Sequence, residues 1–153
     1  IDVRSLTLIA PAGLSRGING AFLAGYCDAR SEADLEAWMS VLVHDPALVS
    51  GTLVRATARA RSDDALVAAQ TRLARSIFPG GTQRFSVRPA IETFAGPVRA
   101  IVGLDDAIIE PPAPGALPAH VAVHHLAGVG HMPMLETPQL VGRLIGENVR
   151  SAG

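Results

Sequence analysis

The chain has 153 residues, of which 48% are hydrophobic and 18% charged, and its formal net charge is −1 at pH 7. Its basic residues are all arginines without a cluster, so the sequence predicts neither a nucleic-acid-binding surface nor a charged-membrane partner. The single cysteine, Cys27, cannot form an internal disulfide, and no apolar stretch approaches the roughly 18 residues of a membrane span. We therefore expect one soluble, cytoplasmic domain.

The first predicted element is a strand within residues 5–13, whose sequence is SLTLIAPAG. Leu6, Leu8 and Ile9 form a continuous apolar run that proline and glycine end. Such a run, without polar alternation, is typical of a parallel strand that is covered on both faces.

Residues 31–78 predict a block of helices with no strand candidate. Cap-like residues predict three helix starts, at Ser31, Asp45 and Ser62. A Pro-Gly-Gly sequence at residues 79–81 ends the third helix. The block therefore interrupts any sheet that begins with the first strand.

Two further strands and a last helix follow the block. Residues 98–103 (VRAIVG) and 120–126 (HVAVHHL) predict strands, and Thr137 is the predicted cap of the last helix. The predicted buried stripe of that helix consists of Leu140, Val141, Leu144 and Ile145. Strands separated by helices favour a parallel α/β sheet with a helical insertion after its first strand. Three strands leave the outer edge of the first one unpaired, so we expect association there.

The candidate chemistry lies after the second and third strands. The sequence GLDDAII places Asp105 and Asp106 after one strand, and GVGHMPM places His131 after the next. Adjacent parallel strands end at the same sheet edge about 4.8 Å apart, so a carboxylate there can accept the Nδ1 proton of the histidine. The Nε2 atom is then free to act as a general base. Flanking glycines permit a tight turn, and residues 132–135 are expected to form apolar walls.

The other titratable residues favour simpler interpretations. His120 and His124 are predicted on one face of the third strand and His125 on the other, so we expect no metal site there. Glu136 is interpreted as a charge that suits the dipole of the last helix.

Two long segments carry a resemblance to a known family. PVRAIVGLDDAII and LPAHVAVHHLAGVGHMPMLETPQLV resemble the C-terminal part of α/β-hydrolase-fold enzymes, in which an acid follows the seventh strand and a histidine the eighth. This resemblance implies that His131 is the base and Asp106 the acid, with Asp105 as the weaker alternative. SLTLIAPAGLSRGINGAFLAGYCDARSEADL, DPALV and IFPGGTQ resemble the acetyltransferase component of acetoin dehydrogenase complexes.

The resemblance implies a partial α/β-hydrolase domain over residues 1–153. Residues 14–85 would form its helical lid, residues 96–153 would carry the acid and the histidine, and the N-terminal strands of the fold would precede Ile1. The implied function is acyl transfer between dihydrolipoamide and coenzyme A in the whole protein, whose lipoyl group and coenzyme A are not bound by this chain. The chain alone is expected to be inactive and to pair with the missing half or with a second copy.

The sequence GLSRG of residues 13–17 raises the question whether Ser15 is the nucleophile. It matches the G-x-S-x-G pattern and would complete the Ser, Asp, His order of that fold. Ser15 is nevertheless predicted not to be the nucleophile, because Pro11 and Ala12 separate it from the strand and the following glycines disfavour an immediate helix. Two alternative functions remain: a serine hydrolase of small esters or carbon–carbon bonds, and a non-catalytic interaction module.

Overall fold

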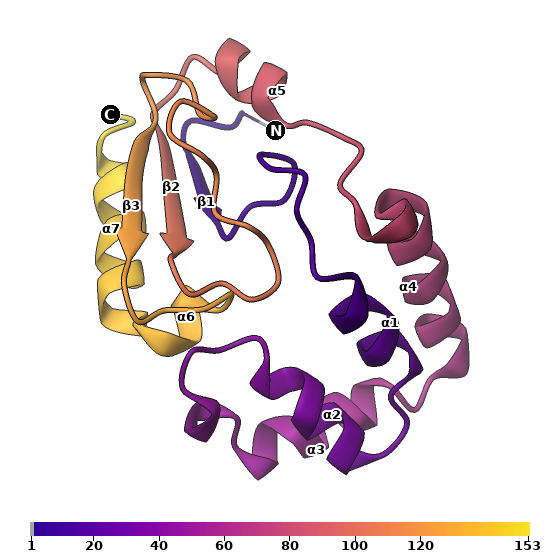
Figure 1. Cartoon of the computed structure of the whole chain (residues 1–153). Helices are drawn as coiled ribbons and strands as arrows, with labels where there is room; N and C mark the ends of the chain where they lie inside the picture. The colour runs from indigo at the N-terminus through magenta and orange to yellow at the C-terminus, as the bar shows by residue number, and fades with distance from the viewer. Residues whose placement is uncertain (1) are drawn as a thin grey trace.

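The computed structural model describes residues 2–153, and Ile1 lies outside this range. Strands β1 (Leu6–Ile9), β2 (Val98–Gly103) and β3 (Ala122–Leu126) form a parallel sheet in the order β1-β2-β3. All three arrows in Figure 1 point the same way, and helix α7 (Pro138–Arg150) runs along one side of the sheet. The predicted three-stranded parallel sheet is confirmed.

Helices fill the chain between β1 and β2. They are α1 (Gly20–Asp28), α2 (Glu32–Ser40), α3 (Gly51–Ala60), α4 (Asp64–Ile77) and α5 (Arg88–Thr93), with short 3-10 turns at Pro46–Leu48 and Pro79–Gly81. Figure 1 shows α1 to α4 as a group beside the sheet, with α2 and α3 beyond the arrowheads of the strands. The short helix α6 (Pro133–Glu136) lies between β3 and α7. The predicted helical insertion after the first strand is therefore confirmed.

The helix starts agree with the sequence in part. Ser31 forms the predicted capping box with Asp34, which fixes the start of α2. Asp45 caps only a 3-10 turn, because Ser50 supplies a second cap from which α3 begins. The cap of α4 is Asp63 rather than Ser62, since the Asp63 carboxylate accepts two backbone N–H bonds.

Strand β2 is the buried centre of the sheet. Ala100 and Ile101 are fully buried, and Ile101 packs against Val141 and Leu144 of α7. Ala100 packs on the other side against Ile91 of α5. Strand β1, in contrast, is only partly buried along its length, because it lies at the edge of the sheet.

Helix α7 differs from its predicted pattern at both ends. Thr137 does not cap the helix with its side chain, because its hydroxyl donates to the Pro133 carbonyl instead. Ile145 is 36% exposed, whereas Asn148 is 2% exposed. The Asn148 amide donates to the Leu6 carbonyl at 2.8 Å, so this polar residue anchors α7 to β1.

Candidate active site

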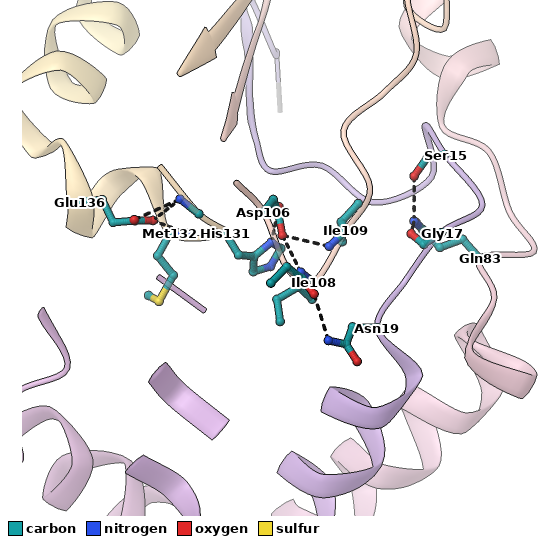
Figure 2. A network of polar contacts seen from close by, with 12 residues as sticks. Ser15, Gly17, Asn19, Gln83, Asp106, Ile108, Ile109, His131, Met132 and Glu136 are labelled. Carbon is teal, nitrogen blue, oxygen red and sulfur yellow. Dashed lines mark hydrogen bonds and ion pairs between the residues drawn. The ribbon is translucent and has the colours of Figure 1, made fainter. Parts of the chain in front are cut away.

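Asp106 and His131 are in direct contact. The Nδ1 atom of His131 lies 2.8 Å from Oδ2 of Asp106. Figure 2 shows the imidazole next to this carboxylate. Gly103 at the end of β2 pairs with Leu126 at the end of β3, so the two loops leave the same edge of the sheet. The register of two neighbouring strands thus brings the predicted acid and base together.

The Asp106 carboxylate is held by three donors. Its Oδ1 atom accepts the backbone N–H groups of Ile108 at 2.8 Å and Ile109 at 2.9 Å, while Oδ2 faces His131. Burial of this side chain, which is only 2% exposed, would by itself raise the pKa of Asp106. The hydrogen bonds from His131 and from the two backbone amides outweigh burial and hold the pKa of Asp106 below its ordinary value.

The state of Asp106 decides the tautomer of His131. An ionised carboxylate only accepts hydrogen bonds, so the hydrogen of a neutral imidazole sits on Nδ1 and points at Oδ2. The lone pair is then on Nε2, which has no hydrogen-bond partner among residues 2–153. The His131 side chain is 23% exposed, so part of it is open to solvent. This arrangement is that of a general base with its orienting acid.

The acid loop is fixed by the helices as well as by the sheet. Asn19 caps α1 with its Oδ1 atom, donates its Nδ2 to the Ala107 carbonyl at 3.0 Å and its backbone N–H to the Ile108 carbonyl at 2.8 Å. The Ile108 and Ile109 side chains pack in one apolar cluster with Phe22 of α1. The carboxylate therefore sits on a loop that the first helix of the insertion holds.

The histidine loop depends on two glycines for different reasons. Gly128 has a φ of +69°, a left-handed conformation that side chains disfavour. Gly130 does not have a positive φ. A Cβ atom at this position, however, would lie 2.9 Å from the backbone nitrogen of His44. The first glycine makes the turn, and the second lets the loop approach the helical block.

Asp105, the alternative acid, has another role. Its Oδ2 accepts the backbone N–H of Gly128 at 2.8 Å, and its own N–H donates to the Val129 carbonyl at 3.0 Å. Asp105 therefore ties the acid loop to the histidine loop and does not contact the imidazole.

The predicted apolar wall forms only in part. Met132 and Leu135 pack against the cluster that Leu35, Met39 and Val43 form in the helical block. Met134 is 44% exposed. Two of the apolar residues after the histidine therefore face the helices, and one faces solvent.

Ser15 contacts Gln83 rather than His131. The Gln83 amide donates to Ser15 Oγ at 3.4 Å and to the Gly17 carbonyl at 2.9 Å, and its oxygen accepts the Gly13 N–H at 2.6 Å. Figure 2 shows Ser15 well to one side of the Asp106–His131 pair. Helix α1 begins five positions after Ser15, so the loop lacks the immediate strand-to-helix turn of a nucleophile elbow.

Of the remaining histidines, His124 lies on β3. His124 is partly buried, and burial followed by the charge of Arg99 lowers its pKa. Over residues 2–153 the structure contains no cluster of three metal-ligating side chains and no helix long and apolar enough for a membrane span.

Two polar residues that hold the site, Asn19 and Glu136, and Gln83 in the separate Ser15 loop make contacts that the sequence does not predict. The sequence assigns no role to Asn19 or Gln83 and indicates for Glu136 only a charge that suits the helix dipole. The Asn19 cap carries a detectable signal, since an asparagine precedes an apolar helix start. Gln83 and Glu136 act on backbone groups far away in the sequence, for which no local pattern exists.

No protein-family model matches the chain. A curated relative is the dihydrolipoyllysine-residue acetyltransferase component of the acetoin cleaving system of Pseudomonas putida, which is 32% identical over 141 residues. This alignment covers 92% of the chain and 37% of that protein.

Several solved structures share the fold. A meta-cleavage product hydrolase from Pseudomonas fluorescens superposes with a TM-score of 0.76 at 20% identity, over 96% of this chain and 56% of that one. A 2-hydroxy-6-oxo-6-phenylhexa-2,4-dienoate hydrolase from Rhodococcus gives a TM-score of 0.74 at 17% identity, over 95% and 55%. The chain thus spans about half the length of these structures and 37% of the curated relative. Its architecture is the C-terminal half of the α/β-hydrolase fold, the fold to which this chain belongs.

Proposed function

We propose that this chain supplies the acid and the base of an acyl-transfer site, in which Asp106 orients His131 and His131 moves the proton. The observation that carries the proposal is the 2.8 Å contact between His131 Nδ1 and Asp106, with Nε2 left without a partner in the described chain. The curated similarity supports acetyl transfer from a dihydrolipoyl group, and the acceptor would be coenzyme A.

The proposed step exchanges one thioester for another. His131 Nε2 removes the proton of the acceptor thiol, and Asp106 stabilises the imidazolium that forms. The thiolate attacks the acyl carbon, a new carbon–sulfur bond forms, and the bond to the donor sulfur breaks. The departing thiolate then takes the proton from His131, so the base is regenerated.

We assign the remaining parts of the domain on the same basis. Residues 14–85 would be a lid that shapes the acyl pocket, which the packing of Phe22 against Ile108 and Ile109 supports. Residues 96–153 carry the acid and the base. The rest of the domain, or a second copy, would complete the site and pair with the outer edge of β1.

The nucleophile, if the reaction uses one, is proposed to come from outside residues 1–153. No serine or cysteine between residues 2 and 153 forms a hydrogen bond with the His131 ring. We therefore expect the chain alone to hydrolyse simple esters at a negligible rate, because it has a base but no nucleophile in contact with it.

The test is an assay of the natural polypeptide that carries these residues. S-acetyl-dihydrolipoamide and coenzyme A are supplied, and acetyl-coenzyme A and free acetate are measured separately. Transfer is expected in the unsubstituted protein, and His131→Ala is expected to lower it by about 10²- to 10⁴-fold. Glu92→Gln is the control, since Glu92 only pairs with Arg88 on α5.

The products separate the alternatives. Free acetate without acetyl-coenzyme A would identify a hydrolase and contradict the transfer proposal. Equal product formation in the unsubstituted protein and in His131→Ala would contradict any catalytic role of the pair and favour an interaction module.

A further inference from the structure

The Glu136 carboxylate joins two distant parts of the chain. Its oxygens accept the backbone N–H of Gly130 at 2.9 and 3.0 Å and that of Met132 at 3.3 Å. Oε2 also accepts the backbone N–H of His44 at 2.7 Å, from a residue 92 positions away. Among residues 2–153 no arginine or histidine forms an ion pair with Glu136, so the hydrogen bonds that its carboxylate accepts within the described chain come from backbone amides.

The amides that Glu136 binds lie on both sides of His131. Gly130 and Met132 are its chain neighbours, and the N–H of His131 itself donates to the Leu42 carbonyl at 2.9 Å. The backbone at the histidine is thus bound either to Glu136 or to residues 42–44. In Figure 2 Glu136 reaches this backbone from one side, while Asp106 meets the imidazole from the other.

Residues 42–44 and the histidine loop touch without an intervening side chain. A Cβ atom on Gly130 would lie 2.9 Å from His44 N and 3.1 Å from the Leu42 carbonyl oxygen. Met132 packs into the same apolar cluster as Val43. The Glu136 carboxylate therefore accepts hydrogen bonds from both segments, residues 42–44 and the histidine loop, at the place where their backbones touch.

We propose that Glu136 is a positioning residue for His131, and that it couples the placement of the imidazole to the docking of residues 42–44. This inference rests on the proposed role of His131 as the base. Only one ring atom, Nδ1, is bound within the described chain, so the direction of the ring depends on the backbone that carries it. When residues 42–44 leave the loop, Glu136 loses one donor, His131 N–H loses its acceptor, and the imidazole loses its fixed direction.

Glu136→Gln tests this with little change of shape. A carboxylate offers two acceptor oxygens, whereas a glutamine amide offers one oxygen and turns an NH₂ group toward a backbone donor. At least one of the bonds to Gly130, Met132 or His44 is therefore lost. Glu92→Gln is the matched control, because it removes a carboxylate that binds only Arg88.

Two readouts are measured by nuclear magnetic resonance on the folded chain. The first is the low-field signal of the His131 Nδ1 proton, which reports its bond to Asp106. The second is amide hydrogen exchange of His44 and Gly130. We expect Glu136→Gln to remove or broaden the ring signal and to speed exchange of the His44 amide by about tenfold or more, and Glu92→Gln to change neither.

A ring signal unchanged in Glu136→Gln would overturn the inference, even if stability falls. If Glu136→Gln does not fold, amide hydrogen exchange of His44 in the unsubstituted chain tests the inference instead. His44 is an exposed residue, so its amide is expected to be protected only through Glu136. Exchange of this amide at the rate of an unstructured peptide would then overturn the inference. Neither readout needs activity, so a failed transfer assay leaves this test intact.

Discussion

His131 and Asp106, 25 positions apart, share a hydrogen bond of 2.8 Å at the edge where β2 and β3 end. The sheet brings the two loops together, and the helical insertion then holds each of them. Asn19 binds the acid loop, and the backbone of residues 42–44 binds the histidine loop. The geometry of the pair therefore depends on both the sheet and the helices.

The lowered pKa of Asp106 predicts a loss of stability in acid. The pKa of Asp106 is lower in the folded chain than in the unfolded one, so the ionised carboxylate stabilises the folded chain. This contribution to the free energy of unfolding is fully present above the unfolded pKa of about 3.9. It is lost as the pH falls through the lower folded pKa. Urea unfolding at a series of pH values between about 6 and about 2 measures this decrease in the free energy of unfolding.

Asp106→Asn is the comparison for that titration. The variant should be less stable at neutral pH and should show a shallower decrease toward acid, because position 106 no longer ionises. Parallel pH curves for the two proteins would contradict the assigned shift.

Gly103 and Gly142 should respond in opposite ways to alanine. A Cβ atom on Gly103 would lie 2.1 Å from the Gly130 carbonyl oxygen, so Gly103→Ala should separate β2 from the histidine loop and cost about 1–3 kcal/mol. A Cβ atom on Gly142 would have no neighbour within 4 Å. Gly142→Ala lies in α7 and should stabilise the chain by about 0.5–1 kcal/mol. Thermal unfolding measures both, and equal effects would contradict this packing.

Asn19 should matter to the acid loop beyond its role as a helix cap. Asn19→Ala removes the cap of α1 and the bond to the Ala107 carbonyl, and Ser50→Ala removes only the cap of α3. Each should lower the free energy of unfolding by about 0.5–2 kcal/mol. Only Asn19→Ala should speed amide exchange at Ile108 and Ile109. Similar amide exchange at Ile108 and Ile109 in both variants would contradict a role of Asn19 in holding the acid loop.

Ser15→Ala should leave acetyl transfer unchanged in the natural polypeptide. Ser15 Oγ receives one long hydrogen bond from Gln83, at 3.4 Å, and no bond from His131. A fluorophosphonate probe should therefore fail to label Ser15. Labelling that Ser15→Ala abolishes would identify this serine as the nucleophile after all.

The sequence predicted the elements whose signals are local. Pattern or resemblance predicts the apolar strand at residues 98–103, the Ser31 capping box and the contact between Asp106 and His131. The split at Ser50 was missed because two caps stand close together, and either one fits a helix start.

The supporting contacts of the site were not predictable in this way. Asn148 occupies a helix position that is buried on folding, and its amide donates there to the Leu6 carbonyl and to the Thr7 hydroxyl of β1. Glu136 sits at the end of a short helix, where its charge suits the next helix, yet it binds His44. Such roles depend on which backbone groups the fold leaves without partners, and those are fixed only by tertiary contacts.

The tautomer of His131 tests the central claim most directly. The ring nitrogens are observed by ¹⁵N resonance at neutral pH in the unsubstituted chain and in Asp106→Asn. A protonated Nδ1 and an unprotonated Nε2 in the unsubstituted chain, changed in Asp106→Asn, is the predicted result. A hydrogen on Nε2 in the unsubstituted chain, or the same spectrum in both proteins, would contradict the account.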